Sequence, residues 1–253
     1  MPLATAAILN EPKERLIVAL DVDSADSARA LIGEIGNVVG AFKIGLQLFS
    51  SSGPDFVREL TGAGHRIFLD LKFHDIPNTV SAASIEAARL GVWMFNVHAL
   101  GGAEMLRRTA NSVAEFCERE GIERPKIIGV TVLTSSDANE LREIGIETGV
   151  EATVLNLARL AAKCSLDGIV ASPREAAAVK NAAGGNFLVV TPGIRPASET
   201  NDDQKRVNTP ADAARLGADY LVVGRPITAA DNKREAATAI VNEIAAASDP
   251  IPG

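Results

Sequence analysis

Short apolar runs alternate with longer helix-like segments along almost the whole chain. Eight runs have the length and composition of buried strands: 16–22, 41–46, 66–72, 94–99, 126–133, 168–172, 187–193 and 220–226. Between or after them lie stretches rich in Ala, Leu and Glu with helical spacing: 24–36, 79–91, 102–120, 150–164, 173–183 and 233–247. This alternation predicts parallel βα units throughout. The segment 140–147, after the fifth run, predicts a short extra helix in a long βα loop.

The number of predicted βα units distinguishes between two α/β architectures, an open sheet and a barrel. A doubly wound open sheet often carries a G-x-G-x-x-G motif after its first strand, and no such motif follows residue 22. Eight βα units in 253 residues instead favour a (β/α)₈ TIM barrel. The sequence therefore predicts one domain of the α/β class over residues 15–247. Residues 1–14 are interpreted as an N-terminal extension and 248–253 as a C-terminal tail.

The amino-acid composition limits which partners the protein can bind and which cellular compartment it suits. The formal net charge of −7 argues against a general binder of nucleic acid or of anionic membranes, although a local basic site could hold a small anion. The two cysteines, Cys117 and Cys164, lie in helix-like segments, which predicts free thiols in a reducing compartment. The N-terminus lacks a basic signal-peptide region, and no apolar run is long enough to cross a bilayer. We expect a cytoplasmic protein.

Polar residues gather at the ends of the predicted strands, where TIM barrels carry their chemistry. The stretch FLDLKFHDIPNTV, residues 68–80, concentrates three charges at the end of the third run. Strand alternation places two of them on one face, opposite Leu69 and Leu71. The candidate residues at strand ends are Asp21, Lys43, Asp70, Lys72, Asp75, His98, Thr134, Arg195 and Arg225.

Each candidate also has a purely structural interpretation. Asp23, beside Asp21, fits a helix N-cap, and His98 fits a hydrogen-bonded histidine of the core or rim. Lys43 alone could be a surface lysine with a buried stem, and Asp70 with Lys72 a structural ion pair. Buried ion pairs stabilise poorly, however, because desolvation can exceed the Coulomb attraction. Their gathering at one end of the predicted barrel favours a functional site.

The last two strand ends predict a phosphate site. Loops after strands seven and eight commonly bind phosphate in this fold, and here they supply Gly193, Arg195, Gly224 and Arg225. Glycine lets backbone N–H groups approach an anion, and arginine offers a bidentate fork. The long polar segment 194–209 is interpreted as a lid, from which Gln204 could reach the phosphate.

The residues alone thus indicate an enzyme that acts on a phosphorylated small molecule by proton transfer or carbanion chemistry. Two alternatives stay open. One is a metal-dependent sugar-phosphate lyase or aldolase on the same barrel. The other is a catalytically silent barrel that binds a nucleotide.

The motifs of the chain, in order, resemble the bacterial form of the orotidine 5′-phosphate decarboxylase family. The likeness extends from FLDLKFHDIPNTV to LIVALDV, FKIGLQLF, NVHA, VTVLTS, KCSLDGIVASPREA, VTPGIRP and YLVVGRPIT, over residues 15 to 245. The D-x-K-x-x-D core is shared with hexulose-phosphate synthases and ketogulonate-phosphate decarboxylases. Those metal-dependent relatives carry an acid where this chain has Lys43, so the lysine favours the orotidylate branch.

The resemblance implies a role for each matching residue. Lys72 would protonate C6 of the pyrimidine, Asp70 would face the substrate carboxylate, and Lys43 would contact the ribose and complete the charge network. Asp75 and Thr79 would be contributed across a homodimer interface. The remaining implied contacts are Asp21 and Thr79 to ribose, Thr134 near the pyrimidine, and Arg195, Gln204, Gly224 and Arg225 to phosphate. No cofactor and no metal are implied.

Overall fold

The computed structural model describes residues 11–134, 136–196 and 209–248 of the chain. Within this part of the chain, eight strands follow one another in chain order in a closed barrel, and helices alternate with them. The predicted (β/α)₈ barrel is confirmed. The strands are β1 (Leu16–Ala19), β2 (Ala41–Gly45), β3 (Ile67–Phe73), β4 (Met94–His98), β5 (Lys126–Val130), β6 (Gly168–Val170), β7 (Leu188–Pro192) and β8 (Tyr220–Val223).

The helices fall between these strands or after the last one. The α-helices are α2 (Ala25–Ile35), α3 (Leu46–Gly62), α4 (Pro77–Arg89), α5 (Gly102–Glu120), α6 (Ala138–Glu143), α7 (Val150–Lys163), α8 (Pro173–Ala183), α9 (Pro210–Arg215), α10 (Arg225–Thr228) and α11 (Lys233–Ser248). Two 3₁₀ turns, η1 (Pro12–Arg15) and η2 (Ala99–Gly101), precede β1 and α5. The chain divides into two compact units: residues up to 68 together with those from 191 onward, and residues 69–190.

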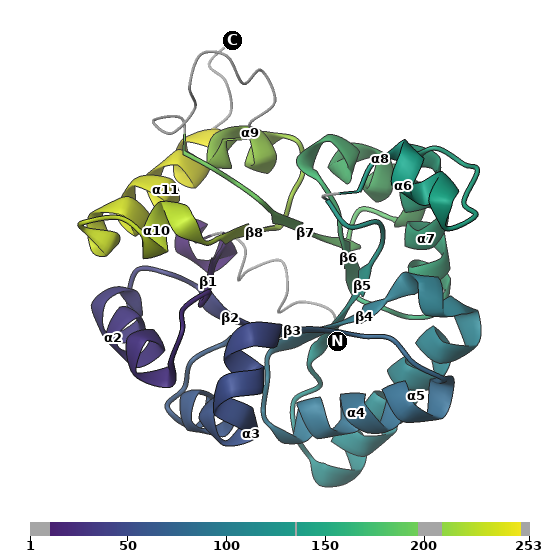
Figure 1. Ribbon diagram of the computed structural model, residues 1–253, viewed down its shortest axis with the longest axis horizontal. Coiled ribbons are helices and arrows are strands. Elements are labelled where there is room, and N and C mark those ends of the chain that lie inside the picture. The colour runs from purple at the N-terminus through teal and green to yellow at the C-terminus, as the bar shows by residue number, and fades with distance from the viewer. Residues whose placement is uncertain (1–10, 135, 197–208, 249–253) are drawn as a thin grey trace. The chain divides into compact units, whose positions relative to one another are not determined.

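The first unit is built around β1. This strand pairs in parallel with β2 and β8, and Val18 lies opposite both Phe42 and Val223. All four residues of β1 and all four of β8 are buried. Continuous apolar runs of this kind are typical of parallel strands that are covered on both faces. On the outside, α11 packs against α9 and α2 (Figure 1).

In the second unit, β4 pairs in parallel with β5, β5 with β6, and β6 with β7. Helices α4 and α5 lie side by side in it (Figure 1). Phe116 of α5 is buried beneath two arginines, Arg89 at 4.9 Å and Arg119 at 5.4 Å from its ring centre. Because the two guanidinium groups lie over the aromatic ring, charged side chains complete this part of the helical layer.

Helices α5, α7, α8 and α11 begin at the residues that the sequence pattern predicts, whereas α4 and α6 each begin two residues earlier than predicted. Pro77 occupies the first turn of α4, where its missing N–H costs nothing. The extra helix in the β5 loop is confirmed as α6, which Asp137 opens with a capping box. The prediction for Asp23 is wrong: the side chain of Ser24 caps α2 by accepting the N–H of Ser27. Asp23 instead accepts a hydrogen bond from Gln47.

Other differences concern where elements begin and end. Strand β8 ends at Val223, so Gly224 and Arg225 open α10 rather than extend the strand. Helix α3 lacks a clear sequence pattern because Gly53, with φ of 70°, and Pro54 kink it in the middle. Both cysteines are free and buried, as expected, and burial raises the pKa of the Cys117 thiol. Among the described helices, none has the length and apolar character that a membrane crossing requires.

Candidate active site

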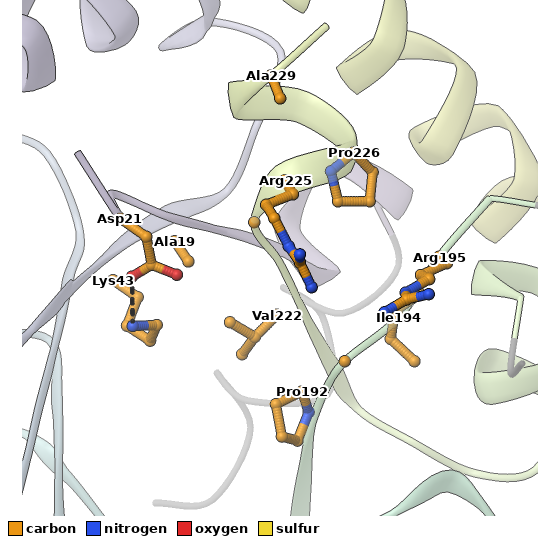
Figure 2. A pocket seen from close by; sticks show the side chains of 12 residues that line it. Ala19, Asp21, Lys43, Pro192, Ile194, Arg195, Val222, Arg225, Pro226 and Ala229 are labelled. Atoms are coloured by element: carbon orange, nitrogen blue, oxygen red, sulfur yellow. Dashed lines mark hydrogen bonds and ion pairs between the residues drawn. The ribbon is translucent and has the colours of Figure 1, made fainter. Parts of the chain in front are cut away.

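A cavity of about 500 Å³ opens in the first unit at the carboxyl ends of its strands (Figure 2). In a TIM barrel this is the end that carries ligands. Most of its charged lining is basic, which suits an anion. The lining residues are Ala19, Asp21, Lys43, Pro192, Gly193, Ile194, Arg195, Val222, Gly224, Arg225, Pro226 and Ala229.

Two of the predicted site residues form an ion pair in this cavity. The ammonium of Lys43, in the middle of β2, lies 3.3 Å from a carboxylate oxygen of Asp21 (Figure 2). The Lys43 side chain is 12% exposed and that of Asp21 60%, so the lysine is held inside while the carboxylate faces the opening. A methyl group added at Gly45 would lie 3.1 Å from the Lys43 ammonium. The glycine therefore leaves this nitrogen free space on one side.

The two arginines predicted to bind phosphate line the same cavity. Arg195 follows β7, and Arg225 begins α10 directly after β8 (Figure 2). Both side chains are exposed, so their guanidinium groups are accessible to a ligand. Gly224 also lines the cavity, and a methyl group there would lie 3.4 Å from a carboxylate oxygen of Asp21. Gln204 and most of the predicted lid lie outside the described residues.

The second unit holds the Asp70–Lys72 pair at the end of β3. The Lys72 ammonium lies 2.6 Å from a carboxylate oxygen of Asp70, and the side chains are 32% and 14% exposed, respectively. Strand alternation predicted this shared face, and the ion pair confirms it. Lys72 has a backbone φ of 51°, a left-handed conformation that costs a non-glycine residue about 1–2 kcal/mol. Strain of this kind gathers at functional sites.

The sequence interpretation missed Asn96 of β4. Its side-chain oxygen accepts the backbone N–H of Lys72 at 2.8 Å, and its amide nitrogen donates to Asp70 at 2.7 Å. Asn96 is 1% exposed. The signal that could have revealed it is a lone amide inside the apolar run MFNVH, since a buried polar side chain needs partners.

His98, at the end of β4, is half-buried, as predicted for a histidine of the core or rim. Its hydrogen bonding differs from the prediction. Its ring lies 5.2 Å from that of His74, but its Nδ1 atom is buried without a hydrogen-bond partner. Burial, followed by the nearby charges of His74 and Lys72, lowers the pKa of His98, while Asp70 acts in the opposite direction. The surroundings of His98 therefore favour its neutral form over the protonated one.

The remaining predicted residues of the second unit lie on its surface. Asp75 is exposed, and its carboxylate accepts the backbone N–H of Ile76. Thr79, in the first turn of α4, and Thr134, after β5, are also exposed. Ile76, between Asp75 and Thr79, is 66% exposed, which is high for a large apolar side chain.

Comparison with known proteins connects these features to a family. The model of the orotidine 5′-phosphate decarboxylase / HUMPS family matches residues 14–240. The chain belongs to this family. Curated orotidine 5′-phosphate decarboxylases resemble it along their whole length. That of Geobacter sulfurreducens is 51% identical over 94% of this chain and 98% of its own, and that of Geotalea daltonii is 50% identical with the same coverage.

Solved structures give the same result for this member of the orotidine 5′-phosphate decarboxylase / HUMPS family. The crystal structure of orotidine 5′-phosphate decarboxylase from Lactobacillus acidophilus superimposes with a TM-score of 0.80 at 38% identity, covering 90% of this chain and 98% of that one. An uncharacterised conserved protein from Geobacillus kaustophilus has the same TM-score at 36% identity. The family resemblance found in the sequence is confirmed.

Proposed function

We propose that this enzyme decarboxylates orotidine 5′-phosphate to uridine 5′-phosphate and CO₂, the last step of de novo UMP synthesis. The family match and the full-length likeness to curated decarboxylases support this reaction. The observation that carries the chemical part of the proposal is the Asp70–Lys72 pair, in which an ammonium group and a carboxylate meet at 2.6 Å. We place the reaction in the cytoplasm.

Lys72 is the proposed proton donor. Loss of CO₂ from C6 leaves a vinylic carbanion that the pyrimidine ring delocalises poorly, so fixed charges must stabilise it. The Lys72 ammonium, held beside Asp70, places a positive charge next to the carbanion at C6. It then donates a proton to this carbon. The reaction as proposed needs no cofactor and no metal.

Asp70 is proposed to face the carboxylate of the substrate. Two like charges about 4 Å apart at an effective dielectric constant of about 20 repel by roughly 4 kcal/mol. Departure of CO₂ removes this repulsion, while the attraction between Lys72 and the new carbanion grows. Lys43 and Asp75 complete the proposed row of alternating charges around the reacting carbon.

The basic cavity of the first unit is the proposed site for the ribose phosphate. Arg195 and Arg225 suit phosphate through bidentate hydrogen bonds, and Gly224 leaves room for a close approach. Asp21 and Lys43 suit the ribose hydroxyls, and Thr134 is assigned to the pyrimidine. Gln204, outside the described residues, is assigned to the phosphate. Binding energy from the phosphate, which lies far from C6, can then order the site for catalysis.

The enzyme is proposed to act as a homodimer in which Asp75 and Thr79 reach the partner's substrate. The exposure of these two side chains, together with the exposed apolar Ile76 between them, supports a contact surface here. Residues 15–247 form the proposed catalytic barrel, with 1–14 and 248–253 as extensions.

The reaction is tested by the ultraviolet absorbance of orotidine 5′-phosphate mixed with purified enzyme and EDTA. Loss of the orotate absorbance with formation of uridine 5′-phosphate would establish a metal-independent decarboxylase. If the absorbance stayed constant with EDTA, and Mg²⁺ with pentulose or hexulose phosphates gave turnover instead, the metal-dependent branch would be the correct one.

The role of Lys72 is tested by Lys72→Ala. We expect kcat to fall by at least about 10³-fold, because both charge stabilisation and the proton donor are removed. Binding of uridine 5′-phosphate, held through its phosphate, should remain measurable by calorimetry. Lys163→Ala, at an exposed position in the last turn of α7, is the matched control and should keep wild-type kcat. Near-normal turnover by Lys72→Ala would exclude Lys72 as the donor.

A further inference from the structure

Asn96 is a buried polar residue in an otherwise apolar strand. It lies in the middle of β4, it is 1% exposed, and its neighbours Phe95 and Val97 are fully buried. Placing an amide in such surroundings is unfavourable unless each of its polar atoms finds a partner. An apolar side chain of similar size would serve packing better, so the amide requires a separate explanation.

The partners of Asn96 all belong to the proposed reacting centre. Its Oδ1 accepts the backbone N–H of Lys72 at 2.8 Å, and its Nδ2 donates to Asp70 Oδ1 at 2.7 Å. The same Asp70 oxygen accepts the Lys72 ammonium at 2.6 Å. The orientation of the amide is fixed by chemistry, because only the oxygen can accept an N–H and only the nitrogen can donate to a carboxylate. One side chain thus contacts the backbone of the lysine and the side chain of its acidic partner.

The backbone of Lys72 needs such a constraint. Its φ of 51° is left-handed, and among the described non-glycine residues only Ser165 shares a positive φ. A conformation of this kind persists where the surroundings hold it in place. The hydrogen bond from the Lys72 N–H to Asn96 supplies that hold at the residue itself.

We infer that Asn96 is a positioning residue for the decarboxylase. Its amide holds the main chain of Lys72 in the left-handed conformation and turns the Asp70 carboxylate toward the ammonium. This inference rests on the proposed roles of Lys72 and Asp70. Asn96 acts through these two residues, and its own side chain is closed off from the substrate by its burial.

The geometry also predicts which side chains at position 96 can keep one or both of the hydrogen bonds of Asn96. Asp keeps an acceptor for the Lys72 N–H but cannot donate to Asp70, and it adds a second carboxylate beside the pair. Ala reaches neither partner, so the Lys72 N–H loses its acceptor and Asp70 loses the amide donor while keeping the Lys72 ammonium. The two variants therefore separate the backbone contact from the carboxylate contact.

Asn96→Ala and Asn96→Asp are the test variants, and Thr131→Val is the matched control. Thr131 follows β5, is also 1% exposed, and donates a single hydrogen bond to the Val170 carbonyl at 2.9 Å. It has the burial of Asn96 without its partners. Measurements are kcat and KM for orotidine 5′-phosphate over a pH series, with the melting temperature of each variant.

For Asn96→Ala we expect kcat to fall about 10²-fold with KM changed less than about 3-fold, because a small misplacement of reacting groups costs rate rather than binding. Asn96→Asp should retain more activity than Asn96→Ala and should change the pH profile of kcat, since a second carboxylate favours the protonated lysine. Thr131→Val should lose stability but keep the wild-type kcat and pH profile.

The inference is overturned if Asn96→Ala and Asn96→Asp lose melting temperature as Thr131→Val does while keeping kcat and its pH profile. Should Asn96→Ala fail to fold, the near-isosteric Asn96→Asp decides by the same readouts. A wild-type enzyme without decarboxylase activity, or an active Lys72→Ala, would contradict the proposed function instead. The two failures are therefore distinguishable.

Discussion

Near the end of β3, both the side chain and the backbone of Lys72 are constrained. Lys72 must present its ammonium next to Asp70, and its backbone adopts a left-handed conformation there. An unconstrained lysine would avoid this conformation, so the hydrogen bond from the Lys72 N–H to Asn96 of β4 is needed in addition to the local sequence. The chemistry of the site depends on Lys72, whereas its geometry depends on its neighbours.

His98 provides a prediction at the same scale. Its pKa is lowered by burial and then by the charges of His74 and Lys72, with Asp70 opposing. The folded state therefore disfavours protonated His98, and its contribution to stability is complete above the ordinary histidine pKa of about 6.5. That contribution is lost as the pH falls below this value toward the lower pKa of the folded state.

We therefore expect His98→Gln, which cannot be protonated, to weaken the acid dependence of stability. Melting temperatures at pH 7.5 and 5.5 would be compared for the variant and the wild type. Since all other titratable groups are the same in the two proteins, the difference between their acid dependences isolates His98. Equal losses of melting temperature on acidification would contradict the assignment.

At the scale of elements, the packing of β6 against β7 requires a glycine. A methyl group at Gly168 would lie 2.3 Å from the Leu188 carbonyl oxygen and 2.6 Å from the Leu188 Cβ. Strands β6 and β7 pair at this position, so the backbone has no room to move without breaking the ladder.

Gly168→Ala should lower the free energy of unfolding by about 1–3 kcal/mol, the usual range for overpacking. The matched control is Gly33→Ala at an exposed position in the last turn of α2, where nothing lies within 4 Å of an added methyl group. That variant should stabilise the protein by about 0.5–1 kcal/mol, because alanine favours the helix. Urea denaturation measures both, and equal effects would contradict the packing argument.

The local sequence pattern sets where strands and helices lie, whereas packing sets the residues at which they begin and end. The apolar runs located every strand, but β8 ends at Val223, Gly224 is the N-cap residue of α10, and Arg225 is its first residue. Asp23 and Ser24 are both good N-cap residues, and the sequence alone favoured the wrong one. A one-residue difference of this kind is decided by where the chain leaves the preceding strand.

For the whole molecule, we propose that each subunit contributes Asp75 to the active site of its partner. This arrangement predicts how much activity returns when two inactive variants are mixed. Lys72→Ala and Asp75→Asn homodimers should each be nearly inactive. Mixing them in equal amounts should restore about one quarter of wild-type activity, because half of the re-paired dimers are mixed and each mixed dimer holds one complete site.

Light scattering during chromatography would establish the dimer, and turnover of orotidine 5′-phosphate would follow the mixing. Lys72→Ala mixed with wild-type-like Lys163→Ala is the activity control and should give about half of wild-type activity whether or not subunits exchange. The formation of mixed dimers is therefore followed separately by co-purification with a tagged subunit. If the two inactive variants form mixed dimers and stay inactive, Asp75 does not act across the interface.

The residue pattern alone predicts the number and type of the βα units, the shared face of Asp70 and Lys72, and the basic residues that follow β7 and β8. These features follow from spacing and residue type, which are local properties of the chain. Tertiary structure decided the left-handed backbone of Lys72, the role of Asn96 and the start of α10. Each of these depends on contacts between segments far apart in the sequence: Asn96 lies 24 residues from Lys72. A buried amide can be noticed in a sequence, but its partners exist only once β4 lies against β3, because hydrogen bonds of this kind are satisfied by the folded chain and not by the local pattern.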